Sequence, residues 1–168
     1  MDDDEIYGKV IHQLSFKSAL EQDPPVLSKY KIVTNRVNKK YIQDLINENK
    51  LVRANNKQWS YDADCSTFAS LISLRQLVKQ ENLKHVVSFH SSIPRSKEFK
   101  LLNDQLNTFS SEFGTLHTSQ ISGKDSSGVR TIVLSEFKSF EPSLITNARC
   151  LTEGVDIPVI DAVLFADP

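Results

Sequence analysis

The second half of the chain alternates short apolar segments with amphipathic ones, and this alternation constrains the fold more than any other feature. The apolar runs of strand length are "HVVSFH" (85–90), "FGTLHTS" (113–119), "SLITNA" (143–148) and "AVLFAD" (162–167). Segments 94–108 and 126–138 lie between them and space their apolar residues three and four apart, as helices do. Short apolar strands alternating with helices are typical of a parallel sheet that is buried on both faces. The sequence therefore predicts an α/β fold whose mainly parallel sheet is covered by helices on both faces.

The first half is less regular. The pattern predicts a strand at "KYKIVTNRV" (29–37) and helices over 38–50 and 64–80, with a possible insertion at 50–63 that has no clear period. The first 28 residues contain an acidic run and the Pro24-Pro25 pair, which indicate a linker. We therefore expect a junction over 1–28 and one domain over 29–168.

Composition sets broad limits on function. A length of 168 residues fits a single domain, and a formal net charge of −1 neither requires nor excludes a nucleic-acid partner. No apolar stretch reaches the roughly 18 residues that a membrane span needs. The acidic start "MDDDEIYGKV" is unlike an export signal, which predicts a cytoplasmic protein with Cys65 and Cys150 as reduced thiols.

Candidate binding residues follow the predicted strands. In open parallel sheets, ligands bind at the carboxyl ends of the strands. Ser91 and Arg95 follow the strand at 85–90 and precede a helix, where backbone N–H groups and the helix dipole favour a phosphate. Hydroxyl-rich loops also follow the next two strands. Ser91 and Ser126 have a second interpretation, because serine before a helix is commonly only a cap.

The chain lacks the usual signatures of catalysis. It contains no phosphate loop, no G-x-G-x-x-G turn, no G-x-S-x-G elbow and no Cys/His spacing typical of a metal site. His90 and His117 stand at strand ends without clustered partners, and we interpret them as packed or exposed imidazoles. The sequence thus predicts neither catalytic nor metal-binding residues in this chain.

The last 23 residues resemble a known motif. "TNARCLTEGVDIPVIDAVLFADP" resembles motif V of superfamily-two helicases and translocases, above all DEAD/DEAH-type proteins related to restriction-enzyme motor subunits. "HVVSFHSS" resembles motif IV, and "HTSQISGKDSSGVRTIVLSEFKS" resembles the strand-loop-helix between the two motifs. The first residues resemble the junction that leads from the first motor domain to the second. The resemblance covers about residues 1–35 and 83–168. It implies a three-layer, RecA-like second motor domain.

The resemblance also implies roles for single residues. Gly154 would allow close approach to the nucleotide side of the cleft, and Asp156 would accept hydrogen bonds from the ribose or from an arginine finger. Glu153 would orient the loop. The residues expected on the nucleic-acid track are Ser91, Arg95, Thr118, Thr146, Asn147, Arg149, Thr152 and Glu153. An ordinary strand-end turn is the alternative for Thr146 and Asn147, and a surface acid is the alternative for Glu153.

Motif VI and the whole first motor domain are not found in this sequence. The resemblance therefore implies a fragment of an ATP-dependent helicase or translocase, cut before motif VI and inactive alone. ATP and Mg would serve only the full-length parent. The implied partners are nucleic acid, with DNA favoured over RNA, and the missing first RecA-like domain. A cut here also predicts exposed apolar surface and self-association through that edge.

Two other functions are considered. The chain could be a stand-alone α/β module that binds a ligand or a protein, in which "EGVDIP" is simply a tight connection. An independent hydrolase that uses His90 or His117 with an aspartate is the third hypothesis.

Overall fold

The computed structural model describes residues 13–34, 36–49, 61–109, 114–148, 150–151 and 157–166. The chain divides into two compact units, Met1–Thr34 and Asn35–Pro168, so the first unit extends six residues beyond the expected junction. In the described part of the first unit, Ser15 caps helix α2 (Phe16–Glu21) by accepting a hydrogen bond from the Ser18 N–H at 3.0 Å.

The strand expected over 29–37 is not formed. The described residues of this segment have no regular structure, and Tyr30 and Ile32 are 65% and 81% exposed. An alternating pattern produces a strand only where a neighbouring strand supplies hydrogen bonds and packing, and none pairs with these described residues. This prediction was wrong because the pattern carries no information about the partner.

Four helices of the second unit match the predicted segments closely. They are α3 (Lys39–Asn49), α4 (Tyr61–Gln80), α5 (Ile93–Phe109) and α6 (Ser127–Ser139). Of the possible insertion at 50–63, residues 50–60 lie outside the described part, and 61–63 belong to the first turn of α4. Among the described helices, none is both long and apolar enough to span a membrane.

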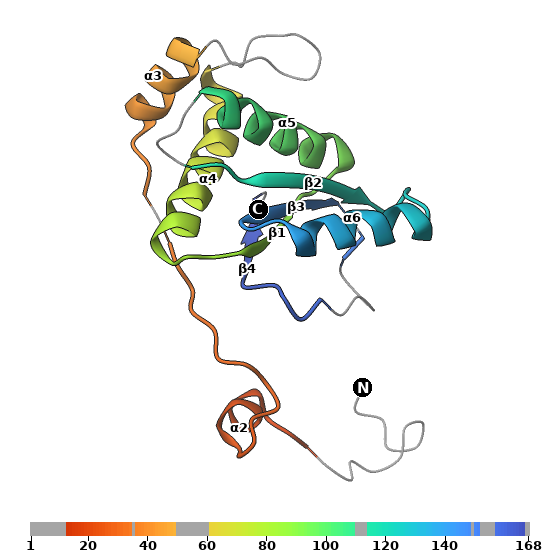
Figure 1. Ribbon diagram of the computed structural model, residues 1–168. Helices are drawn as coiled ribbons and strands as arrows, with labels where there is room; N and C mark the ends of the chain where they lie inside the picture. The colour runs from red at the N-terminus through yellow and green to blue at the C-terminus, as the bar shows by residue number, and fades with distance from the viewer. Residues whose placement is uncertain are drawn as a thin grey trace, which may run out of the picture. The chain divides into compact units, whose positions relative to one another are not determined.

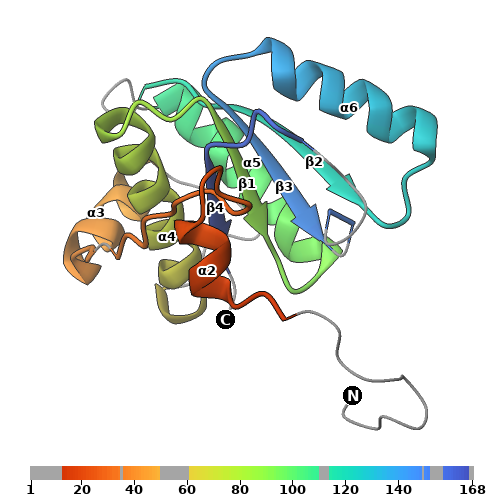
Figure 2. The ribbon, with the colours of Figure 1, turned by 90° about the horizontal axis from the view of Figure 1, so that it is seen from below.

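The described strands form one parallel sheet (Figure 1). They are β1 (His85–Phe89), β2 (His117–Ser122), β3 (Ser143–Ala148) and β4 (Ala162–Phe165). Their order is β2-β3-β1-β4, and every neighbouring pair is parallel. Figure 2 shows the arrows of β1, β2 and β3 pointing the same way. The predicted parallel sheet is confirmed.

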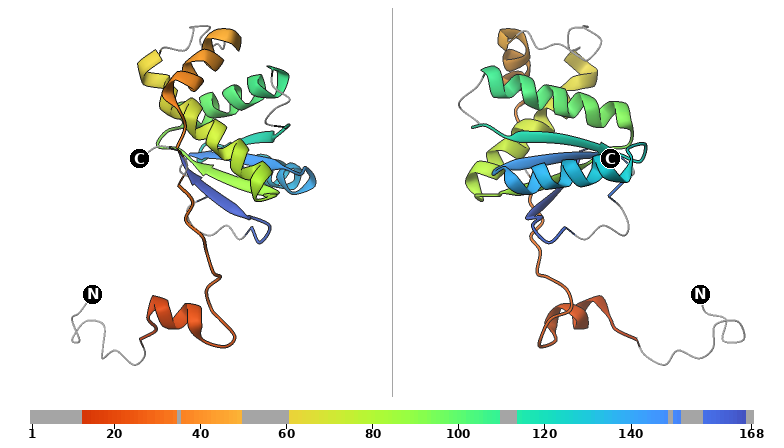
Figure 3. Two further views of the ribbon diagram at one scale, coloured as in Figure 1. Left: turned by 90° about the vertical axis from the view of Figure 1, so that its left-hand side faces the viewer. Right: turned by 45° about the vertical axis from the view of Figure 1, so that its right-hand side comes forward.

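Side chains of the sheet alternate between two buried cores. Val86 and Leu144 pack in the larger core with α3, α4 and α5, whereas Val87 and Ile145 pack in the smaller core against Phe137 of α6. Figure 3 shows α4 and α5 on one side of the sheet and α6 on the other. The predicted three-layer α/β fold, with helices on both faces, is therefore confirmed.

A buried arginine joins the helices on one face. Arg75 of α4 is 1% exposed, and its Nε donates to Asn103 Oδ1 at 2.8 Å. Its Nη1 donates to the Gly114 carbonyl at 3.0 Å, and its Nη2 donates to the Asn103 carbonyl at 3.0 Å and to Asn107 Oδ1. Burial lowers the pKa of Arg75 to about 10, an effect that the charge of Asp104 opposes. The guanidinium therefore stays charged at neutral pH.

Asp161 fixes the start of β4 against the start of β1. Its Oδ2 accepts hydrogen bonds from the backbone N–H groups of Lys84 at 2.7 Å and His85 at 3.0 Å, and its own N–H donates to the His85 carbonyl at 2.9 Å.

We expect Asp161→Ala to lower the free energy of unfolding by about 1–2 kcal/mol, because two backbone donors lose a charged acceptor. Urea denaturation measures the change. Glu136→Ala, an exposed acid on α6, is the control and should change stability by less than about 0.5 kcal/mol. Equal stability of the two variants would contradict the role given to Asp161.

One strip of the sheet stays exposed on the α6 side. Val163 and Phe165 of β4 are 50% and 78% exposed, and Phe165 stacks on Phe89 with ring centroids 5.8 Å apart. Ala162 and Leu164, on the other face of β4, pack against the larger core. Val163 and Phe165 thus form an exposed apolar strip, and self-association through this edge stays a prediction.

Candidate nucleic-acid interface

The carboxyl ends of the strands are level with one another. Asn147 of β3 pairs with Phe89 of β1 and with Ile121 of β2, and Phe89 pairs with Phe165 of β4. The connections that follow these strands therefore open at one edge of the sheet. This is the edge at which parallel α/β folds bind ligands.

The loop after β1 leads directly into α5. Ser91 and Arg95 are both exposed there, as a phosphate contact requires. The cap of α5 is supplied by Ser92, whose Oγ accepts from the Arg95 N–H at 3.4 Å and whose carbonyl accepts from the Ser96 N–H at 3.1 Å. The capping role that was considered for Ser91 thus belongs to its neighbour.

The loop after β2 is held on both sides. Asp125 Oδ2 accepts from the Ser122 N–H at 2.6 Å and from the Ser122 Oγ at 3.0 Å. Arg130 Nη2 donates to the Gly123 carbonyl at 3.1 Å, and the exposed Lys124 stands between these contacts. Lys124 adds a positive charge at the carboxyl edge. Its position after Gly123, between a strand and a helix, is the sequence signal that could have selected it.

Ser126 acts as a helix cap. It is the N-cap of α6, and its Oγ accepts from the Val129 N–H at 3.4 Å. The cap-only interpretation of this serine agrees with the contacts that it makes.

Thr146 and Asn147 lie inside the sheet instead of on its surface. Both are 0% exposed. Asn147 Oδ1 accepts hydrogen bonds from the N–H groups of Cys150 at 3.2 Å and Leu151 at 3.1 Å. Side chains without exposed surface cannot contact a phosphate in this conformation. The expectation that Thr146 and Asn147 contact nucleic acid directly therefore does not hold for this structure. The physical reason is that β3 continues through them before the connection begins.

Thr118 lies at the wrong end of β2 for the expected track. The strand was predicted over 113–119 and spans 117–122, so Thr118 is its second residue. Its side chain is buried, accepts a hydrogen bond from Asn103 Nδ2, and donates to the Leu116 carbonyl at 3.2 Å. Thr118 therefore supports the packing of α5. It lies near the amino end of β2 and not at the carboxyl edge, where it was expected.

The remaining predicted residues of the connection after β3 fall outside the described part of the chain. They are Arg149, Thr152, Glu153, Gly154 and Asp156. The described ends of this connection are anchored, because Cys150 and Leu151 pack against the smaller core and Ile157 is one of its buried members. Their roles toward ATP and nucleic acid stay predictions.

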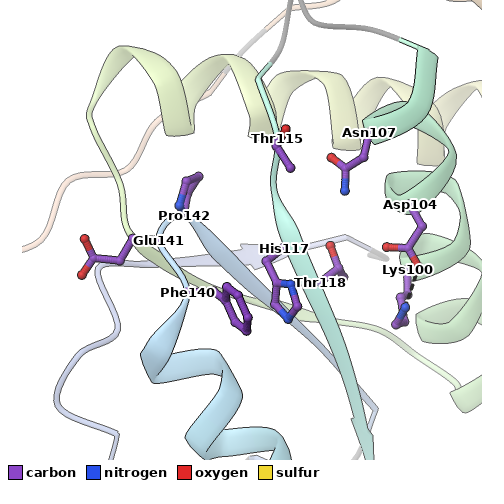
Figure 4. A pocket seen from close by; sticks show the side chains of 9 residues that line it. All are labelled: Lys100, Asp104, Asn107, Thr115, His117, Thr118, Phe140, Glu141 and Pro142. Carbon is purple, nitrogen blue, oxygen red and sulfur yellow. Dashed lines mark hydrogen bonds and ion pairs between the residues drawn. The ribbon is translucent and has the colours of Figure 1, made fainter.

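A cavity of about 430 Å³ lies at the opposite edge of the sheet (Figure 4). His117 and Phe140 stack on its wall with ring centroids 4.0 Å apart. Lys100 and Asp104 form an ion pair of 2.5 Å on another side. Glu141, also in the lining, pairs with Lys84 at 2.8 Å and raises the pKa of that lysine. The cavity is separate from the carboxyl-edge loops, since His117 begins β2.

The two histidines considered for catalysis lie at opposite edges of the sheet. His90 is 7% exposed, shares a hydrogen bond of 2.9 Å with Ser88 Oγ, and packs against Phe99. His117 lies at the amino end of β2, at the other edge of the sheet. Among the described residues, no group of three or more His, Cys, Asp or Glu side chains could hold a metal ion.

A comparison with solved structures finds chains of similar fold. The chain is similar to "Mss116p DEAD-box helicase domain 2 bound to an RNA duplex", at 20% sequence identity and a TM-score of 0.45. The match covers 58% of this chain and 37% of that chain. No protein-family model and no curated protein matches the sequence.

Proposed function

We propose that this chain supplies a RecA-like second motor domain to an ATP-dependent nucleic-acid helicase or translocase. The single observation behind the proposal is the adjacency of two loops at the carboxyl edge. The loop after β1 resembles motif IV, the connection after β3 resembles motif V, and their strands are hydrogen-bonded neighbours. A motor of this kind needs both loops on one rim, facing the same strand of nucleic acid.

In this proposal, Ser91, Arg95 and Lys124 contact phosphates from the described part of the edge. Arg149, Thr152 and Glu153 extend that surface on the strength of the resemblance alone. Gly154 and Asp156 face ATP and its Mg, which bind between this domain and a first RecA-like domain of the parent protein.

Alone, the chain binds single-stranded nucleic acid weakly and hydrolyses nothing. Binding assays with DNA and RNA strands of equal length decide which of the two it prefers.

The nucleotide part of the proposal is tested in the parent protein. We expect Asp156→Ala to reduce nucleic-acid-stimulated ATP hydrolysis about a hundredfold, because a group that orders the transition-state contacts is lost. Phosphate release measures the rate, and Glu136→Ala on the outer face of α6 serves as the control. Full stimulated activity in the Asp156→Ala parent would remove Asp156 from the site.

The cavity at the amino-terminal edge favours a second candidate function, a stand-alone α/β module that binds a small ligand. Its volume of about 430 Å³ lies within the usual range of such sites. The gene discriminates between the two functions. A Gln-x-x-Gly-Arg helix encoded after Pro168 and a phosphate loop encoded before Met1 support the motor, and a stop codon after Pro168 supports the module.

A further inference from the structure

We propose that Asn147 is a positioning residue that holds Cys150 and Leu151 after β3 and His90 after β1. It is the penultimate residue of β3 and has no exposed surface. Its side-chain Oδ1 accepts from two successive backbone N–H groups, those of Cys150 at 3.2 Å and Leu151 at 3.1 Å. A single buried acceptor therefore fixes the direction in which the chain leaves β3.

The backbone of the same residue holds the other loop. The His90 N–H donates to the Asn147 carbonyl at 2.9 Å, and His90 is the first residue after β1. The His90 ring is fixed in turn by Ser88 Oγ at 2.9 Å and by Phe99 of α5 at a centroid distance of 4.8 Å. The loop that leads to Ser91 thus starts from a residue bound to Asn147 on one side and to α5 on the other.

The two contacts of Asn147 connect the loops through one buried point. A shift of Cys150 and Leu151 therefore reaches His90 through the side chain and the backbone of Asn147. Neighbouring Thr146 provides a useful contrast. It is equally buried, but its Oγ1 has no hydrogen-bond partner in the described part of the chain, so it holds neither loop. That these loops contact nucleic acid rests on the proposed function, whereas the positioning itself does not.

Amide hydrogen exchange of the whole chain, resolved by residue with NMR, tests the proposal. In Asn147→Leu we expect the amides of Cys150 and Leu151 to exchange at least about tenfold faster, because their acceptor is lost. Asn147→Asp keeps an acceptor oxygen and should restore slow exchange. Thr146→Val is the matched control at the same depth and should change both rates by less than about threefold. The amide of Val87 in β1 reports global loosening.

The proposal is overturned if the exchange rates at Cys150 and Leu151 do not change in Asn147→Leu, or rise equally in Thr146→Val. It is also overturned if Val87 accelerates to the same extent, since the loss is then global. If the leucine variant does not fold, Asn147→Ser provides the same test, because its shorter hydroxyl cannot reach both amides.

Binding of a fluorescein-labelled single-stranded oligonucleotide separates this inference from the proposed function. Asn147→Leu should weaken binding about tenfold and Asn147→Asp should recover most of it. If the unaltered chain binds neither DNA nor RNA strands, the proposed function fails, while the exchange rates still decide the positioning role.

Discussion

Replacing Arg75 with methionine is expected to lower the free energy of unfolding by about 3 kcal/mol. The change removes a guanidinium whose three nitrogens all donate within the buried region between α4 and α5. Methionine fills a similar space but removes the donor that Arg75 supplies to Asn103 Oδ1 and to the Gly114 carbonyl, whereas Asn107 Oδ1 keeps the Leu116 N–H at 3.1 Å. Unfilled buried acceptors cost more than the hydrogen bonds contribute, which is why we expect a large effect. Urea denaturation measures the change in the free energy of unfolding. We expect the dependence of this free energy on urea concentration to stay the same.

Two further variants show whether charge or geometry is responsible. Arg75→Lys keeps a cation but has no planar fork, so we expect it to recover less than half of the lost stability. Lys79→Met, at an exposed position near the end of α4, controls for the loss of a cation and should cost less than about 0.5 kcal/mol. A stable Arg75→Met protein would show that the hydrogen-bonded arginine contributes no net stability.

Arg95→Glu is expected to weaken the binding of single-stranded nucleic acid at least about tenfold. The exposed side chain stands in the first turn of α5 at the carboxyl edge, so the change replaces attraction by repulsion next to a phosphate. We also expect the slope of log affinity against log salt concentration to fall by about one, since one phosphate contact is lost. Fluorescence anisotropy at several salt concentrations measures both quantities.

Lys138→Glu is the matched control for this experiment. It changes the net charge by the same amount, but Lys138 lies in the last turn of α6, at the far edge of the sheet. We expect it to lower affinity by less than about twofold. If both variants weaken binding equally, the effect is one of net charge, and the carboxyl edge is not the binding surface.

Much of the fold could be predicted because its signals are local. The helices α3, α5 and α6 have apolar stripes that residue spacing reveals, and β1 and β3 are apolar runs of strand length. The strand expected over 29–37 failed because pairing is not local. The start of β2 was misplaced by four residues, since "FGTLHTSQIS" contains no sharp boundary between apolar and polar residues.

The sequence could predict the edge of the sheet at which the candidate site lies, but not which of its side chains are exposed. The rule for parallel sheets selected the loop of Ser91 and Arg95, which is exposed and lies next to the end of β3, and its binding role stays a prediction. The strand predicted over 143–148 already contained Thr146 and Asn147, but the sequence could not show that their side chains are buried, because both are polar and strands buried on two faces are usually apolar. The link from His90 to Asn147 was also hidden, as it joins backbones 57 positions apart.

The unequal size of the two cores has a consequence for how the domain opens. Among the described residues, the core shared with α4 and α5 contains most of the fully buried side chains, and the core under α6 contains few. Sub-global unfolding begins where the least apolar surface is buried, so the α6 layer should detach first. The connection after β3 is anchored in that weaker layer through Ile157. Ile157 should therefore lose its packing early, while the opposite half of the domain stays folded.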